Sequence, residues 1–185
     1  SAPAAPAENR FWLVDPIDGT QSFAKGDSGW CVAVALIHNG APELAGIFAP
    51  VSGLLYTATA GHGAFCNGAA ITTSRRAGLE GARLIANAAA LSQAGFPTVE
   101  RASLHSIALR LCAVASGAQD GMLAIGPKKD WDIAAGDLIV REAGGRASDL
   151  QGAALLYGHG APKRSGVLAS GPNLHQEMIS RTTLI

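Results

Sequence analysis

The chain has 185 residues, 48% of them apolar, and its 14 Lys and Arg residues balance 14 Asp and Glu residues to a formal net charge of zero. This length accommodates one domain or two small ones. A neutral chain whose basic residues occur in short, scattered pairs lacks the positive surface that binds nucleic acid polymers. No apolar run approaches the roughly 18 residues of a membrane-spanning helix. The sequence therefore predicts neither a nucleic acid polymer nor a membrane as partner.

The three cysteines, Cys31, Cys66 and Cys112, are odd in number and widely spaced. They match no metal-ligand spacing and are typical of small buried residues in a reducing compartment. The Pro- and Ala-rich N-terminus has no basic start followed by an apolar stretch, so it does not have the pattern of a signal peptide. We expect a cytoplasmic location.

The N-terminal half predicts a meander of antiparallel strands. The first ten residues have no periodicity and are predicted as a loop, and residues 11–14 as a buried strand that ends at Asp15-Pro16. Asn-Gly pairs, at Asn39-Gly40 and Asn67-Gly68, indicate tight turns. The further predicted strands are residues 31–37, 44–48, 54–59 and 70–73.

After Arg76 strands and helices alternate. The predicted strands are residues 84–86, 122–125 and 167–169, and the predicted helices are residues 104–116, 132–143 and 173–181, with Gly144-Gly145 ending the second helix. The change from antiparallel strands to alternating elements predicts a mixed α+β or α/β protein with two sub-domains, residues 1–78 and 79–185.

The densest chemical signal is the hexapeptide Asp15-Pro16-Ile17-Asp18-Gly19-Thr20 at the end of the first predicted strand. Carboxylates and backbone carbonyls are the ligands that hard divalent cations such as Mg²⁺ prefer. A helical turn starting at Gly19 and Thr20 would present N–H groups to a phosphate. The combination indicates phosphoryl chemistry. The alternative is an Asx-type turn, in which Asp and Gly only make a tight corner.

A second acidic motif, Asp130-Trp131-Asp132, stands at the predicted start of the helix at 132–143. Asp132 is either the N-cap of that helix or the distant third acid of a two-metal site. The small residues that follow, at positions 134–136, would let the start of the helix lie close to another backbone.

The two motifs together resemble the inositol monophosphatase family of metal-dependent phosphatases. The resemblance rests on Asp-Pro-Ile-Asp-Gly-Thr at 15–20, Trp-Asp-Ile-Ala-Ala-Gly at 131–136 and Glu-Ala-Gly-Gly at 142–145, with shorter matches at 63–68 and 112–117. It runs from about Phe11 to the C-terminus. It implies the family's layered α-β-α-β-α sandwich, here without the N-terminal helices and first strands.

The resemblance also implies roles for individual residues. Two or three Mg²⁺ ions would be held by Asp15, the backbone carbonyl of Ile17, Asp18 and Asp132. Gly19 and Thr20 would bind the phosphate, and Thr20 and Asp15 would act in catalysis, the Thr20 hydroxyl helping to orient the attacking water. Paired metals stabilise both the entering and the leaving oxygen of an in-line displacement. Inhibition by Li⁺ and a homodimer are further implications of the resemblance.

Haloacid-dehalogenase-type phosphatases are a rival class, because they carry Asp-x-Asp-Gly-Thr. In this chain Asp15 and Asp18 are three residues apart, and apolar Ile17 stands where the second Asp would be needed. A regular strand places residues i and i+2 on one face, but not i and i+3. The spacing therefore does not fit this class.

The family also places a glutamate pair and an earlier aspartate upstream of its first metal motif, whereas Glu8 is the one acidic residue before Asp15. The resemblance thus implies an N-terminally incomplete chain with weak metal binding, little activity and an exposed sheet edge where the missing strands belong. A truncated, non-catalytic phosphate-binding domain is the alternative. The joint presence of Asp15, Asp18, Thr20 and Asp132 favours the enzyme.

Substrate choice rests on a few positions. Inositol-type members carry a glutamate seven residues before the third metal Asp, where this chain has Ile125, which cannot accept a hydrogen bond. The run at 125–127 is instead similar to the Phe-Gly-Pro run of bacterial 3′(2′),5′-bisphosphate nucleotidases. Arg110 stands where those enzymes have a lysine and would meet a second phosphate, unless it is a solvated helix residue. Ser106 stands where the family contacts substrate. We expect a small soluble phosphate, with a bisphosphate nucleotide preferred over inositol 1-phosphate or another polyol phosphate.

Overall fold

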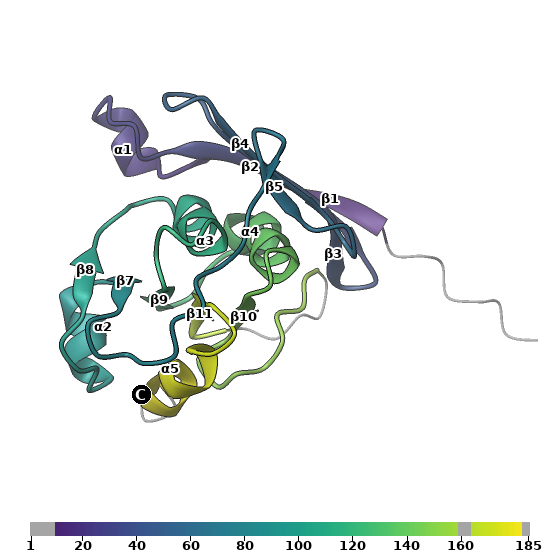
Figure 1. Ribbon diagram of the computed structural model, residues 1–185. Helices are drawn as coiled ribbons and strands as arrows, with labels where there is room; N and C mark the ends of the chain where they lie inside the picture. The colour runs from purple at the N-terminus through teal and green to yellow at the C-terminus, as the bar shows by residue number, and fades with distance from the viewer. Residues whose placement is uncertain (1–9, 159–163, 183–185) are drawn as a thin grey trace, which may run out of the picture.

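The computed structural model describes residues 10–158 and 164–182 and stacks sheets and helices in layers (Figure 1). A six-stranded sheet forms one side, helices α3 (Ile107–Ala115) and α4 (Asp130–Glu142) lie beneath it, and a five-stranded sheet with two short helices completes the other side. This arrangement confirms the predicted mixed sandwich of sheets and helices. Within the described ranges, no helical layer covers the outer face of the six-stranded sheet.

The six-stranded sheet is an antiparallel meander in the order of the chain. Its strands are β1 (Arg10–Asp18), β2 (Cys31–His38), β3 (Ala41–Ala49), β4 (Leu54–Thr59), β5 (Ala64–Cys66) and β6 (Ala69–Ala70). The predicted hairpin at Asn39-Gly40 is confirmed, since both residues have positive φ angles of 50° and 80°, as a tight two-residue turn requires. The prediction for β4 matches its bounds, whereas β5 was not predicted and the strand predicted at 70–73 is reduced to β6.

Strand β1 continues past Asp15-Pro16, where the sequence predicted its end. Proline is tolerated there because β1 is an edge strand, in which one side of the backbone needs no partner. The register shifts between Asp15, which pairs with Ala33, and Asp18, which pairs with Cys31. Three steps along β1 therefore oppose two steps along β2. The one additional residue bends the strand, and Asp15 and Asp18 are both buried.

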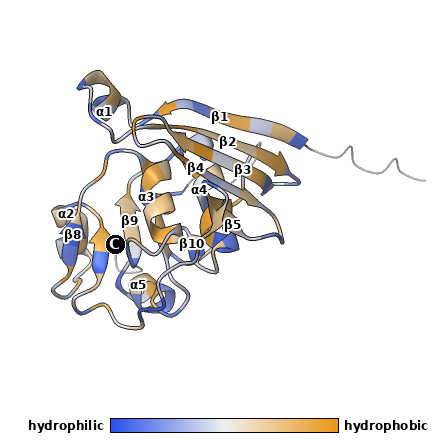
Figure 2. Ribbon diagram, turned by 45° about the horizontal axis from the view of Figure 1, so that its top comes forward, coloured by the Kyte–Doolittle hydropathy of each residue, from blue (hydrophilic) through white to orange (hydrophobic). Residues whose placement is uncertain are grey.

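The outer face of this sheet, turned away from the core, is apolar. Strand β2 alternates between buried residues and partly exposed ones such as Val32, Val34 and Leu36, and Figure 2 shows apolar residues along the neighbouring strands. A sheet with one solvated face normally carries polar residues on it, whereas apolar residues on both faces are typical of a sheet covered on both sides. The large exposed side chains of this face are Trp12, Val14, Leu44, Phe48 and Leu55.

The five-stranded sheet has the order β10-β11-β9-β7-β8, with parallel pairs only where β7 meets β8 and β9. Its strands are β7 (Arg83–Ile85), β8 (Glu100–Ala102), β9 (Gly121–Ile125), β10 (Arg146–Ser148) and β11 (Gly166–Ser170). Helices α2 (Ala88–Gln93) and α5 (His175–Thr182) bury Leu91 and Met178 in a cluster that includes leucines of β7, β9 and β11. The predicted alternation of strands and helices is confirmed. Helix α4 contacts strands of both sheets and so joins the two halves of the chain. The division into residues 1–78 and 79–185 remains a prediction.

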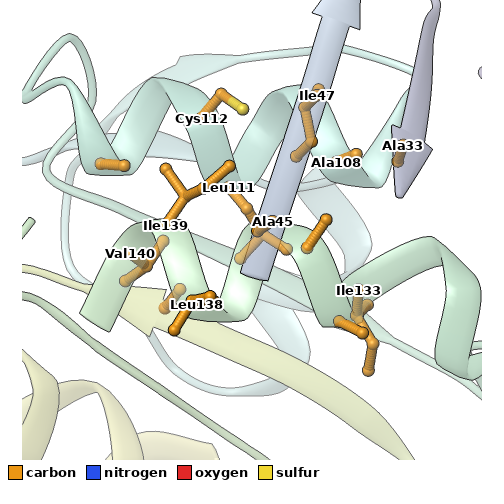
Figure 3. Close-up of a cluster of buried hydrophobic side chains, with 14 of the residues drawn as sticks. Ala33, Ala45, Ile47, Ala108, Leu111, Cys112, Ile133, Leu138, Ile139 and Val140 are labelled. Carbon is orange, nitrogen blue, oxygen red and sulfur yellow. The ribbon is translucent and has the colours of Figure 1, made fainter. Parts of the chain in front are cut away.

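Helix α4 is buried on every side, from Ile133 through Val140, as is typical of a helix between two layers. Ile133 and Leu138 of α4 belong to the same core cluster as Leu111 of α3 and Ile47 of β3, and Figure 3 shows part of this cluster around the two helices. Both central helices differ from prediction at their starts: α3 begins at Ile107 rather than 104, and α4 begins at Asp130 rather than 132. No helix in the described part of the chain is long and apolar enough to cross a membrane.

Candidate active site

A polar cleft of about 420 Å³ opens where the end of β1 meets the start of α4. The short helix α1 (Thr20–Ala24) and the residue before the N-cap of α3 complete its wall. The cleft contains all six of the residues predicted to bind metal or phosphate. Its lining is Asp15, Ile17, Asp18, Gly19, Thr20, Gln21, His105, Trp131 and Asp132.

Asp15 and Asp18 reach this cleft together because of the bulge in β1. Asp15 Oδ1 accepts a hydrogen bond from the backbone N–H of Ile17 at 3.0 Å. This is the Asx-type turn that the sequence offered as the alternative to a functional site. The turn leaves the second oxygen of Asp15 available, so the two interpretations are compatible.

Asp18 connects β1 to the beginning of α3. Its Oδ2 atom accepts hydrogen bonds from the Ser106 hydroxyl at 2.6 Å and from the Ala108 N–H at 2.7 Å. Because both donors belong to the first turn of α3, the position of Asp18 depends on that helix as well as on its own strand.

Asp132 enters the cleft from the first turn of α4. The sequence placed it at the helix start as a possible N-cap, but the N-cap is Lys129, and Asp132 stands three residues later. Its Oδ2 atom accepts a hydrogen bond from the Lys129 N–H at 3.1 Å. Asp132 therefore helps to cap the N-terminus of α4 and also lines the cleft.

All three carboxylates have raised pKa values, and neighbouring negative charge contributes for Asp18 and Asp132. Burial is the main cause in each case, and it raises the pKa of Asp18 to about 6 despite the hydrogen bonds from Ser106 and Ala108. The negative charges of Asp15 and Asp132 raise the pKa of Asp18 further, and Asp15 also raises the pKa of Asp132. The cleft therefore concentrates negative charge in a partly dehydrated place.

These residues fit part of a Mg²⁺ site. None of the three carboxylates has an ion-pair partner among the described residues, and a divalent cation would offset their repulsion. Their oxygen atoms are the ligands that Mg²⁺ prefers. Across residues 10–158 and 164–182, however, no three His, Cys, Asp or Glu side chains are arranged to hold a metal ion. Glu8, the one acidic residue upstream of Asp15, lies outside the described residues.

The turn at Gly19 requires glycine. Its φ angle is +90°, and an added Cβ would lie 2.5 Å from the carbonyl oxygen of Gly29 and 3.1 Å from Ser106 Cβ. The chain reverses here and starts α1, whose Ser22 and Phe23 N–H groups bond the Gly19 carbonyl. Thr20 follows in an exposed position on the cleft wall.

Three residues on which the substrate prediction rests, two of them as expected contacts, do not line the cleft. Ser106 is fully buried beneath Asp18. Arg110 donates from Nε to the Leu104 carbonyl at 2.5 Å, and burial lowers its pKa. Ile125 is partly buried against the core cluster of the five-stranded sheet. A contact of Arg110 with substrate remains a prediction that rests on the resemblance alone, and Ile125 was expected only to lack the hydrogen bond that the inositol-type glutamate makes.

Gln21, His105 and Trp131 line the cleft but were not predicted as site residues. Trp131 stands between the two acids of the second motif, and its side chain is 44% exposed. An exposed tryptophan flanked by predicted functional acids is a signal that sequence reasoning could have used. His105 offered no such signal, because only the fold brings it to the carboxylates.

Comparisons with known proteins agree with this geometry. A family model described as the inositol monophosphatase family matches residues 2–183. A Nus factor SuhB of Xylella fastidiosa is 37% identical over 163 residues, which are 77% of this chain and 56% of that protein. A histidinol-phosphatase of Mycobacterium tuberculosis is 35% identical over 187 residues, 93% of this chain and 69% of that protein. The chain thus spans between 56% and 69% of the length of these relatives.

Solved structures share the fold. An inositol monophosphatase from Anabaena (Nostoc) matches with a TM-score of 0.81 at 25% identity, over 95% of this chain and 75% of that one. The extragenic suppressor protein SuhB of Bartonella henselae matches with a TM-score of 0.81 at 27% identity, over 94% of this chain and 73% of that one.

Proposed function

Because the chain belongs to the inositol monophosphatase family, we propose that it carries the site of a Mg²⁺-dependent phosphate monoester hydrolase that acts on a small soluble phosphate in the cytoplasm. One observation carries the proposal. Asp15, Asp18 and Asp132 line one cleft beside the turn at Gly19, each with a raised pKa and without an ion-pair partner in the described ranges.

In this proposal Asp15, Asp18, Asp132 and the carbonyl of Ile17 hold the cations, two or three in number. Mg²⁺ bound there would activate a water molecule and stabilise the leaving oxygen. The chain's own contribution is to bind and orient. Backbone N–H groups at Gly19 and Thr20 bind the phosphate, and the exposed Thr20 hydroxyl, with Asp15, orients the attacking water. Li⁺ would inhibit by competing for one cation position.

For the substrate we propose a 3′(2′),5′-bisphosphate nucleotide, on the basis of Ile125, the following Gly-Pro pair and Arg110. Two other substrates have specific support. The Anabaena neighbour is named an inositol monophosphatase, which favours inositol 1-phosphate. The 35% identical relative is named a histidinol-phosphatase, which favours the phosphate of an amino alcohol.

We further propose that full activity requires residues beyond these 185. The carboxylates of the cleft fit only part of a Mg²⁺ site, and the relatives are longer than this chain. The uncovered apolar face of the six-stranded sheet is a place where additional chain could pack. The alternative is a domain that binds phosphates without turnover.

The test is phosphate release with Mg²⁺ from 3′-phosphoadenosine 5′-phosphate, inositol 1-phosphate and histidinol phosphate, measured on this chain and on one extended through the upstream coding sequence. Asp132→Asn serves as the control. Release that is strongest with the nucleotide, greater in the longer chain and absent in the control is expected. Preference for another of these substrates would support the proposed phosphatase reaction but overturn the proposed nucleotide substrate. No release from any of the three would contradict the proposed activity.

A further inference from the structure

Ser106 is fully buried between the first turn of α3 and the end of β1. Three groups surround its hydroxyl: Asp18 Oδ2 at 2.6 Å, the Leu109 N–H at 3.0 Å and Cys31 Sγ at 3.4 Å. A serine hydroxyl has one proton to donate and two lone pairs to accept with. An ionised carboxylate can only accept, so the proton of Ser106 points to Asp18. Leu109 and the Cys31 thiol then donate to the serine oxygen, and every partner is satisfied.

Among the described residues, Asp18 is held through one oxygen. Its hydrogen bonds there, from Ser106 and from the Ala108 N–H, both fall on Oδ2. Asp18 also lines the cleft, so Oδ1 is the oxygen that remains available to a ligand there. The contact joins residues 88 positions apart, and it fixes the orientation of the carboxylate as well as its place.

We propose that Ser106 is a positioning residue for the metal site: its hydroxyl ties Oδ2 of Asp18 to α3 and so presents Oδ1 to a divalent cation in the cleft. This inference rests on the proposed function, because it takes Asp18 as a ligand. It assigns to Ser106 a role through Asp18 in place of the direct substrate contact that the resemblance implied. Hydrogen bonds to a ligating carboxylate typically change metal affinity by about 10- to 100-fold.

The competing explanation is that Ser106 only caps α3. A matched variant separates the two roles. Asn87 caps α2 in the same way, accepting the Ala90 N–H at 2.6 Å, and it does not line the cleft. Losing either cap should reduce stability to a similar degree. Only loss of the Ser106 hydroxyl should weaken cation binding.

The experiment measures Mn²⁺ binding to the 185-residue chain by the EPR signal of the free ion, together with thermal unfolding, for wild type, Ser106→Ala and Asn87→Ala. We expect a dissociation constant about 10- to 100-fold higher for Ser106→Ala and unchanged for Asn87→Ala, with comparable decreases in unfolding temperature. If Ser106→Ala does not fold, Ser106→Cys, which keeps the size but only a weak donor, should also weaken binding.

Wild-type affinity in the Ser106 variant, with the stability loss of a cap, would overturn the positioning role and leave the proposed function intact. Failure of the wild-type chain and of the extended chain to bind Mn²⁺ would overturn the metal site itself, and the role of Ser106 with it.

Discussion

Gly136 of α4 lies directly against Leu111 of α3, so closely that a Cβ added to the glycine would stand 2.6 Å from the Leu111 Cβ. Figure 3 shows Leu111 over α4 within the core. The sequence predicted that the small residues at 134–136 let the start of this helix lie close to another backbone, and for Gly136 the close neighbour is the side chain of Leu111. Because Gly136 has no side chain, α3 and α4 can pack this closely at Leu111.

Gly136→Ala should destabilise the protein by about 1–3 kcal/mol, because overpacking outweighs the gain of at most about 1 kcal/mol in helix propensity. Chemical unfolding measures the change. Gly78→Ala is the matched control, since nothing lies within 4 Å of a Cβ there, and it should be neutral or slightly stabilising. A Gly136→Ala protein as stable as wild type would show that the helices can separate at no cost.

Asp132→Asn should stabilise the metal-free protein slightly, by about 0.5 kcal/mol, because it removes a charge that repels Asp15 and Asp18. If the proposed site binds Mg²⁺, the ion should raise the unfolding temperature of the wild-type protein, and Asp132→Asn should abolish that increase. Asp130→Asn is the control: Asp130 lies on the same helical turn but pairs with Arg164 at 2.9 Å. That variant should lose about 1 kcal/mol and keep its response to Mg²⁺. If Asp130→Asn abolished the response to Mg²⁺ and Asp132→Asn kept it, Asp132 would not be a ligand of the metal site.

Glu142→Ala should loosen the turn between β4 and β5. The carboxylate accepts hydrogen bonds from the N–H groups of Gly61 and Gly63, both at 2.9 Å, so it holds this turn on the end of α4. We expect a loss of about 1–2 kcal/mol and faster amide exchange at both glycines. Glu142→Gln keeps one acceptor oxygen, so its stability and its amide exchange rates should lie between those of wild type and Glu142→Ala. Unchanged exchange in the alanine variant would contradict this account.

His175 should make the protein sensitive to mild acid. Burial lowers its pKa from 6.5 to about 4, and its two ring nitrogens lie 3.1 and 3.2 Å from the hydroxyls of Ser148 and Ser170. Because the folded-state pKa is depressed, protonation favours the unfolded chain. The stabilisation by neutral His175 is complete above pH 6.5 and is lost as the pH falls toward 4.

Between pH 7.5 and 4.5 this contribution amounts to about 2 kcal/mol. Unfolding free energies of wild type and His175→Gln at both pH values isolate it, since other groups contribute equally to both proteins. The variant should lose less stability than wild type on acidification. Equal losses would mean that His175 titrates at its ordinary pKa when folded.

The longer strands and helices were predicted well from regular patterns in the sequence, whereas several short strands were not predicted. The strand at 54–59 was predicted at its observed bounds, because apolar alternation and flanking turns are both local signals. Strands of three residues, such as β8 and β10, are too short to show a period. The sequence predicted the start of α4 two residues too late, because Asp is a common N-cap residue, whereas Lys129 holds the N-cap position here.

The site divides in the same way. The acids at 15, 18 and 132 and their neighbours Gly19 and Thr20 share one cleft, as predicted from two motifs. The hydrogen bond from Ser106 to Asp18 was not predictable, because it spans 88 positions and depends on how α3 docks against β1. Likewise, the sequence around His105 gives no indication that this residue lines the same cleft as the carboxylates.

The bulge in β1 also makes the number of residues between Asp15 and Asp18 more important than their identity. One extra residue on β1 relative to β2 is what brings both acids to the same side. Removing or adding a residue there would rotate Asp18 toward the opposite face of the strand, as a slip of one position does in any sheet. Pro16 and Ile17 therefore work as a spacer of fixed length, and a library of insertions and deletions would find this segment far less tolerant than a library of substitutions at position 16.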